Sequence, residues 1–176
     1  MNKKEYLFIL FFSCTILLTA QQNIFDACRQ GNLDTVEKLY NIDANIVNAE
    51  EENGYSALVL SCYYGHEDIV NFLVGKVKSL NNKTSYGSPL MAATVKGYDN
   101  IVGILLKHNA NPNITDEQGV TAAHYAVLFR NYDIVEKLVK ANADFTIKNN
   151  VDKSAMDYAI AHNDEKLNKL LNIQKS

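Results

Sequence analysis

The 176-residue chain has no tryptophan, only 2 prolines and no marked excess of either charge, with 17 Lys and Arg against 20 Asp and Glu. The resulting net charge of −3 argues against a nucleic acid or an anionic membrane as the partner. The 8 glycines and 2 prolines are too few for a disordered or collagen-like chain. The hydrophobic fraction of 47% fits one globular domain with ordinary burial.

The usual motifs of metal binding and catalysis are missing as well. None of the 4 histidines stands in a His-x-x-His or Glu-x-x-His spacing, and no Cys-x-x-Cys pair occurs, so we expect no metal site. The chain shows no nucleophile with a base beside it, no glycine-rich phosphate loop and no paired-carboxylate site. We therefore expect a protein that is not an enzyme, with no catalytic residues and no cofactor.

The first twenty residues differ from the rest of the chain. Lys3 and Lys4 precede an apolar run over residues 6–18, and the small residue Ala20 follows. This order is typical of a cleaved secretory signal, and the run is shorter than the roughly 20 residues of a membrane span. The sequence thus predicts a signal peptide over residues 1–20, cleavage after Ala20, and an exported protein, periplasmic or secreted, that leaves the membrane. An uncleaved anchor is the alternative.

A second interpretation of the N-terminus depends on Cys14. Residues 11–14 are similar to the box at which bacterial lipoproteins are lipidated on the cysteine. Leucine is usual at the position of Phe11, and a polar tether usually follows the cysteine, whereas residues 15–18 stay apolar. Lipidation of Cys14 is therefore the less favoured alternative to cleavage after Ala20.

The remainder of the chain is organised by a repeat of about 33 residues. Hydroxyl residues mark it at intervals of 32, 33 and 33 residues: Ser56, Ser88, Thr121 and Ser154. Nine residues after each comes a turn position: Gly65, Gly97, Arg130 and Asn163, of which only the arginine is unsuited to a tight turn. Apolar residues then recur with helical spacing, as in Ile69, Val70, Leu73 and Val74.

These marks resemble the ankyrin repeat, whose signature is Gly-x-Thr-Pro-Leu-His-x-Ala-Ala followed by Val-x-x-Leu-Leu and Gly-Ala-Asp. The fourth copy has Thr121, His124 and Asn142-Ala143-Asp144 at the corresponding positions, and the third has Ser88-Pro89-Leu90. The resemblance implies an all-α solenoid of helix-turn-helix units with hairpin fingers, about five repeats including two caps. The expected domain covers residues 21–176, with repeats at 22–51, 52–83, 84–115, 116–148 and 149–174. We expect an exported bacterial member of this family.

Several residues have structural roles in this interpretation. His124 is the histidine of the signature and is expected to hydrogen-bond neighbouring finger and helix backbones, and His66 is expected to be structural too. Val77-Lys78-Ser79 departs from Gly-Ala-Asp, so the finger that follows is expected to be irregular. Cys28 and Cys62 occupy equivalent places in adjacent copies, where packed helices lie too far apart for a disulfide. The two thiols are expected to be buried and free.

The resemblance also implies that a partner protein binds the fingers and the exposed inner face of each first helix. Mapped onto this chain, the candidate partner-binding residues are Tyr55, Tyr63, Tyr64, Tyr86, Lys96, Glu117, Gln118, Tyr125, Leu128, Phe129, Tyr158 and His162. The same mapping places Leu60, Ala92, Val95, Val120 and Ala161 on this surface. Exposed aromatic side chains commonly supply much of the energy of protein association.

The function expected from these residues is a monomeric, non-catalytic module that binds another protein. Glu50-Glu51-Glu52 is expected to form a solvated acidic finger tip. An inhibitor or immunity protein for a basic secreted enzyme or toxin is one alternative that such a tip would suit. An accessory factor in peroxide defence is another. The sequence does not choose among the partners.

Overall fold

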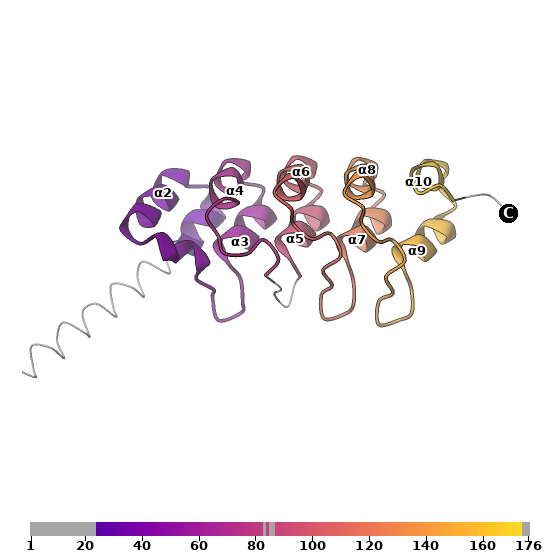
Figure 1. Ribbon diagram of the computed structural model, residues 1–176, viewed down its shortest axis with the longest axis horizontal. Coiled ribbons are helices and arrows are strands. Elements are labelled where there is room, and N and C mark those ends of the chain that lie inside the picture. Colours follow the sequence, from indigo (N-terminus) through magenta and orange to yellow (C-terminus); the bar gives the residue numbers. More distant parts are fainter. Residues whose placement is uncertain (1–23, 83, 85–86, 174–176) are drawn as a thin grey trace, which may run out of the picture.

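The computed structural model describes residues 24–82, 84 and 87–173. Within them, the chain forms pairs of antiparallel helices arranged side by side in two layers (Figure 1). The first helices of the pairs form one layer, called the inner layer, and the second helices form the outer layer. The inner-layer helices are the helix of residues 24–30, α3 (Ala57–Tyr64), α5 (Pro89–Lys96), α7 (Ala122–Leu128) and α9 (Ala155–His162). The outer-layer helices are α2 (Leu33–Ile42), α4 (Glu67–Leu73), α6 (Asp99–Lys107), α8 (Tyr132–Lys140) and α10 (Glu165–Leu170), and a short 3-10 helix, η1 (Ala44–Asn48), follows α2.

The hydroxyl residues that mark the repeat begin the inner-layer helices. The side chains of Ser56, Ser88 and Ser154 accept the backbone N–H three residues further on, at 3.3, 3.3 and 3.1 Å. This bond satisfies one of the N–H groups that a helix start leaves without a partner. Pro89 is the first residue of α5, where its missing N–H has no consequence. The predicted starts of these helices are confirmed.

Each turn between the two helices of a pair contains a residue in the left-handed conformation. The φ angles are 73° at Gly31, 82° at Gly65, 76° at Gly97, 53° at Arg130 and 47° at Asn163. Glycine adopts this conformation without a steric cost, whereas arginine does not. Arg130 therefore takes the backbone shape that the repeat imposes although the residue itself disfavours it.

The fingers between repeats are closed by paired backbone hydrogen bonds. In three of them the N–H of one residue bonds the carbonyl four residues later, as between Glu51 and Tyr55, Asp116 and Val120, and Asn149 and Lys153. In the other, Thr84 and Gly87 exchange both bonds across only three residues. The predicted irregularity of this finger is confirmed, and it results from a loop that is one residue shorter.

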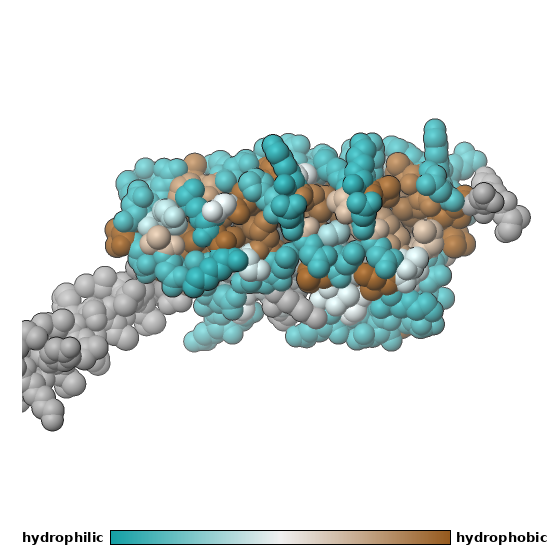
Figure 2. All heavy atoms as spheres, in the orientation of Figure 1, coloured by the Kyte–Doolittle hydropathy of each residue, from teal (hydrophilic) through white to brown (hydrophobic). Residues whose placement is uncertain are grey.

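Apolar side chains fill the space between the layers and between adjacent helix pairs. Most of the predicted apolar positions of the outer helices are buried there: Ile69, Val70 and Leu73 of α4, Val74 after it, Ile101, Val102 and Leu105 of α6, and Ile134, Val135 and Leu138 of α8. The prediction is wrong for Val139, which is 37% exposed, and Leu106 is only half-buried. In Figure 2, hydrophobic atoms form a band along the helical layers, and hydrophilic atoms cover the finger tips below it. No helix of the described residues combines the length and the apolar character that a membrane span needs.

Polar side chains connect each repeat to the next. His124 Nδ1 accepts the N–H of Thr121 at 3.1 Å, and its Nε2 lies 3.1 Å from the carbonyl oxygen of Lys153 in the next finger. His66 Nε2 likewise lies 3.0 Å from the carbonyl oxygen of Arg29. The structural roles predicted for both histidines are confirmed.

A second set of connections uses asparagines at one position of successive repeats. Asn48 accepts the backbone N–H of Lys78 at 2.7 Å, Asn81 that of Asn111 at 2.8 Å, and Asn113 that of Asp144 at 2.8 Å. Each bond satisfies a backbone donor of the following repeat, so the contacts between repeats are polar at this edge as well as apolar in the core.

The two cysteines within the described residues are buried and free, as predicted. Burial raises the pKa of the Cys28 thiol to about 11, and it also raises the pKa of Cys62. Both side chains act as small core residues between adjacent repeats.

Candidate functional site

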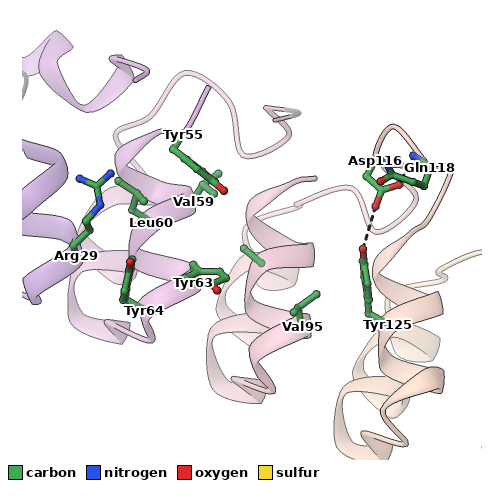
Figure 3. A pocket seen from close by; sticks show the side chains of 11 residues that line it. Arg29, Tyr55, Val59, Leu60, Tyr63, Tyr64, Val95, Asp116, Gln118 and Tyr125 are labelled. Carbon is green, nitrogen blue, oxygen red and sulfur yellow. Dashed lines mark hydrogen bonds between the residues drawn. The ribbon is translucent and has the colours of Figure 1, made fainter. Parts of the chain in front are cut away.

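A groove of about 560 Å³ lies on the inner layer, between the first helices of three consecutive repeats. Its volume falls within the range of ligand pockets, roughly 300–1,000 Å³. Its walls come from the helix of residues 24–30, from α3, α5 and α7, and from two fingers (Figure 3). The lining residues are Arg29, Tyr55, Val59, Leu60, Tyr63, Tyr64, Ala92, Val95, Asp116, Gln118 and Tyr125. Five of the predicted partner-binding residues therefore line one cavity: Tyr55, Tyr63, Tyr64, Gln118 and Tyr125.

The groove exists because side-chain size changes from repeat to repeat. Leu60, Ala92 and Tyr125 occupy the same position of α3, α5 and α7. Ala92, between two larger residues, leaves a hollow above α5. Leu60 and Ala92 are 4% and 8% exposed, so they form the floor rather than the exposed surface expected for them.

Asp116 forms the hydrogen-bonded corner of the groove beside α7. Its Oδ1 accepts the N–H groups of Gln118 and Val120, both at 2.9 Å, which fixes the finger. Its Oδ2 accepts the hydroxyl of Tyr125 at 3.1 Å, a bond drawn in Figure 3. Burial raises the pKa of Tyr125, and the charge of Asp116 raises it further. The tyrosine is thus held as a neutral donor with its ring upright in the groove.

Arg29 closes the opposite end, and it corrects one expectation about the first finger. Its guanidinium bonds both carboxylate oxygens of Glu51, at 2.5 and 2.6 Å, and it also contacts Asp26 at 3.3 Å. Glu50 accepts a hydrogen bond from Asn82 at 3.1 Å. The prediction of a solvated acidic tip is wrong for Glu51, whose side chain is only 21% exposed, because the inner-layer arginine of the first repeat reaches it.

Two further predicted residues line a second, shallower hollow of about 370 Å³ beside the first. Lys96 and Phe129 form part of its surface, and Phe129 is the most exposed aromatic residue on this face at 59%. The ring of Tyr125 stacks with that of Phe129, at 6.2 Å between centroids, so the two hollows are connected through aromatic side chains. The Nζ of Lys96 lies 4.8 Å from the ring centroid of Tyr63.

The remaining predicted residues line neither cavity. Leu128 and Glu117 are exposed, on α7 and on a finger. Tyr158 is half-buried, and its ring packs on His124. Its hydroxyl oxygen accepts a hydrogen bond from Asn149 Nδ2 at 3.3 Å. His162 is also half-buried, with its Nε2 enclosed. Tyr86 lies outside the described residues.

The described residues contain no group of three or more His, Cys, Asp or Glu side chains placed to hold a metal ion. The groove is lined by tyrosine rings, aliphatic side chains and a few fixed polar groups. The predicted signal peptide and Cys14 lie outside the described residues.

Comparison with known proteins places this architecture. The family model described as ankyrin repeats (3 copies) matches residues 24–116, 78–149 and 109–175, which together span nearly all of the described chain. The chain belongs to the ankyrin repeat family. The all-α solenoid implied by the resemblance to ankyrin repeats is confirmed.

Individual ankyrin repeat proteins are similar to this one over much of its length. One from fowlpox virus is 36% identical over 106 residues, 59% of this chain and 24% of the relative. A second from fowlpox virus is 29% identical over 154 residues, 82% of this chain and 45% of the relative. The ankyrin repeat and SAM domain-containing protein 6 of Rattus norvegicus is 31% identical over 133 residues, which are 74% of this chain and 15% of the relative. The chain spans less than half the length of each of these relatives.

Three groove residues were missed in mapping the ankyrin pattern onto the sequence: Arg29, Val59 and Asp116. A signal for two of them was present. Arg29 stands two residues before Gly31, as Tyr63 stands two before Gly65, and Asp116 stands three before the finger residue Gly119. Val59 gives no such signal because it belongs to a helix whose residues are almost all buried.

Proposed function

We propose that this chain is a non-catalytic module that binds another protein through the aromatic groove and the adjoining finger tips. Ankyrin repeats generally mediate protein–protein interaction, which supports a protein as the ligand. The observation that carries the proposal is the clustering of Tyr55, Tyr63, Tyr64 and Tyr125 in one cavity. Tyrosine buries a large area with little loss of side-chain entropy, and its hydroxyl provides a polar contact.

The exposed apolar residues next to the groove extend this surface. Tyr63, Tyr64, Val95, Leu128 and Phe129 are each between 38% and 59% exposed and lie at the ends of α3, α5 and α7. Large apolar side chains grouped on one face of a soluble protein commonly mark an interaction site. The opposite helical layer provides a matched control, because Val139 of α8 is exposed there to a similar degree, 37%.

Site-specific photo-crosslinking in the cells that produce the protein tests the proposal. A benzophenone side chain is introduced into the full-length chain at Phe129 or Tyr64, and in a control chain at Val139. We expect one discrete crosslinked protein from the first two positions and none from Val139. Crosslinking of the same species from all three positions, or from Val139 alone, would refute this surface.

We also propose that the protein acts outside the cytoplasm after cleavage following Ala20. The support is the sequence of residues 1–20, with Lys3 and Lys4 before an apolar run and a small residue at its end. Mass spectrometry of the protein from its native cells decides this, since we expect an N-terminus at Gln21. A lipid-bearing Cys14 or an intact Met1 would contradict it.

The narrower roles as an inhibitor or immunity protein and in peroxide defence stay predictions. The acidic first finger supports the inhibitor role less than expected, because Glu51 is paired with Arg29 and Glu50 is bonded to Asn82. The relatives reported above are viral and mammalian, so a bacterial source also stays a prediction.

A further inference from the structure

The groove contains a carboxylate whose charge has no cationic partner within the described residues. Asp116 is 4% exposed, and its three hydrogen-bond donors are the N–H groups of Gln118 and Val120 and the hydroxyl of Tyr125. No described lysine or arginine forms an ion pair with it. A buried carboxylate has about four acceptor positions, so one stays open beside the Tyr125 hydroxyl. Burial strengthens the attraction between this charge and an added cation relative to the same pair in water.

The other charged end of the groove is already neutralised. Arg29 contacts Glu51 through two short bonds and Asp26 through a third, so it offers an incoming anion little attraction. Figure 3 shows the two ends on opposite sides of α5, with Arg29 beside α3 and Asp116 beside α7. Among the residues that line the groove, the charge left without an ion pair is therefore that of Asp116.

The floor and walls between these ends suit the stem of a long side chain. Ala92 leaves the hollow above α5, and Val95 and Leu60 are apolar. Tyr63 and Tyr125 stand on either side of α5 (Figure 3). The Nζ of Lys96, 4.8 Å from the Tyr63 centroid, shows that a cation is already accommodated near one of these rings.

We propose that the groove receives an arginine side chain of the bound protein, with the guanidinium against Asp116 and the stem above Ala92 between Tyr63 and Tyr125. Arginine fits better than lysine because its planar head both stacks on aromatic rings and donates several hydrogen bonds in a fixed plane. This inference rests on the proposed function, since it names the chemistry that the same surface recognises.

Titration of the isotope-labelled full-length chain with small probes, followed by NMR, tests the inference directly. The probes are the acetyl-methylamide derivatives of arginine, of citrulline, its neutral isostere, and of glutamate. We expect the arginine probe to cause saturable chemical-shift changes at Ala92, Val95, Asp116 and Tyr125. The citrulline probe should bind roughly tenfold more weakly, and the glutamate probe should not bind. Equal binding of arginine and citrulline, or shifts confined to other residues, would overturn the inference.

Two variants identify the contacts. Asp116→Asn keeps an oxygen to accept the N–H groups of Gln118 and Val120 but removes the charge, and we expect at least a tenfold loss of arginine affinity. Ala92→Leu fills the floor and should abolish binding. The control Glu37→Gln removes a charge from an exposed residue of α2, in the opposite helical layer, and should leave the affinity unchanged. If Asp116→Asn fails to fold, the Ala92→Leu variant and the comparison of arginine with citrulline still test the proposed arginine contact. Unchanged affinity in Ala92→Leu would refute the proposed position.

The crosslinking experiment separates failure of this inference from failure of the proposed function. Crosslinks from Phe129 that persist undiminished in the Asp116→Asn chain would leave the module intact and refute the arginine contact. Crosslinks from Phe129 that are lost in Asp116→Asn but kept in Glu37→Gln would support both. If neither Phe129 nor Tyr64 gives a crosslink in a chain that keeps Asp116, the proposed function is refuted, whatever the NMR titration shows.

Discussion

The imidazole of His124 bonds two repeats at once, because its Nδ1 accepts the N–H of Thr121 at 3.1 Å and its Nε2 lies 3.1 Å from the carbonyl oxygen of Lys153. The ring is 1% exposed. These contacts satisfy a helix-start donor in the fourth repeat and a backbone acceptor in the fifth. Because both ring nitrogens contact backbone groups of the protein, the histidine is a structural connection between the two repeats.

Replacement of this histidine should therefore weaken the contact between the last two repeats. His124→Ala removes both hydrogen bonds and leaves a cavity, for which we expect a loss of about 2–4 kcal/mol in the free energy of unfolding. Urea unfolding followed by circular dichroism measures it. His108→Ala, at an exposed helix end, is the control and should change the free energy by less than about 0.5 kcal/mol. Similar losses in both variants would contradict the structural role of His124.

Substitutions at Arg130 and at Gly97, the equivalent turn positions of two repeats, should change the free energy of unfolding in opposite directions. The φ of 53° at Arg130 disfavours a side chain, the Arg130 Nε lies as far as 3.9 Å from Asp164 Oδ2, and the arginine side chain is 52% exposed. We expect Arg130→Gly to raise the free energy of unfolding by about 0.5–1 kcal/mol. Gly97→Ala, at a φ of 76°, should lower it by about 1 kcal/mol.

Thermal unfolding of the two variants beside the unmodified chain measures both effects. A shift of about 2–4 °C corresponds to 1 kcal/mol in a domain of this size. The nearest atom to a β-carbon added at Gly97 is Asn131 Nδ2, 3.4 Å away, so the expected loss comes from the backbone conformation. A decrease in stability for Arg130→Gly would show that the arginine side chain makes a stronger contact than the structure contains.

The buried thiols should be inert while the protein is folded. Because burial raises the pKa of Cys28 to about 11 and also raises that of Cys62, the reactive thiolate is scarce at neutral pH. In a Cys14→Ser chain we expect no reaction with a thiol reagent at pH 7 and reaction of both cysteines after unfolding in urea. Fast reaction in the folded state, or a mass showing a disulfide between them, would contradict this.

The last repeat should be the most sensitive to acid. The N–H and hydroxyl of Ser154 lower the pKa of Asp157, and the hydroxyl of Tyr132 and the N–H of Leu167 lower that of Asp164, both from an ordinary value of 3.8. Because the unfolded carboxyls take up protons first, the stability they contribute is present above about pH 4 and is lost as the pH falls through their folded values.

Hydrogen exchange between pH 6 and pH 3, corrected for intrinsic rates, measures this loss. We expect α9 and α10 to lose protection before α3 and α5, because neither of these two helices has a carboxylate at its N-cap or in its first turn. In Asp157→Asn the pH dependence in α9 should be smaller. Uniform loss of protection along the solenoid would contradict the prediction.

Much of the architecture followed from local features of the sequence. The hydroxyls Ser56, Ser88 and Ser154 mark helix starts, because a capping side chain acts on the backbone three residues away. The 33-residue interval predicts the repeat, because each unit must bury the same face against its neighbour. The shorter finger closed by Thr84 and Gly87 corresponds to the interval of 32 rather than 33 residues between Ser56 and Ser88.

The groove required the tertiary structure. The pairing of Arg29 with Glu51 joins the first repeat to the next finger, and the size of the hollow depends on Ala92 lying between Leu60 and Tyr125. Exposure of the tyrosines likewise depends on neighbours one repeat away, which is why Tyr63 and Phe129 are exposed while Tyr158 packs on His124.

The sequence by itself thus determined the repeat, its helix boundaries and its buried outer-helix faces, because capping, turn geometry and helical periodicity act within a few residues. Only the tertiary structure decided which of the inner-layer side chains form a cavity and which carboxylates are neutralised. Those properties depend on distances between residues about 33 positions apart, and the differences between one repeat and the next set them.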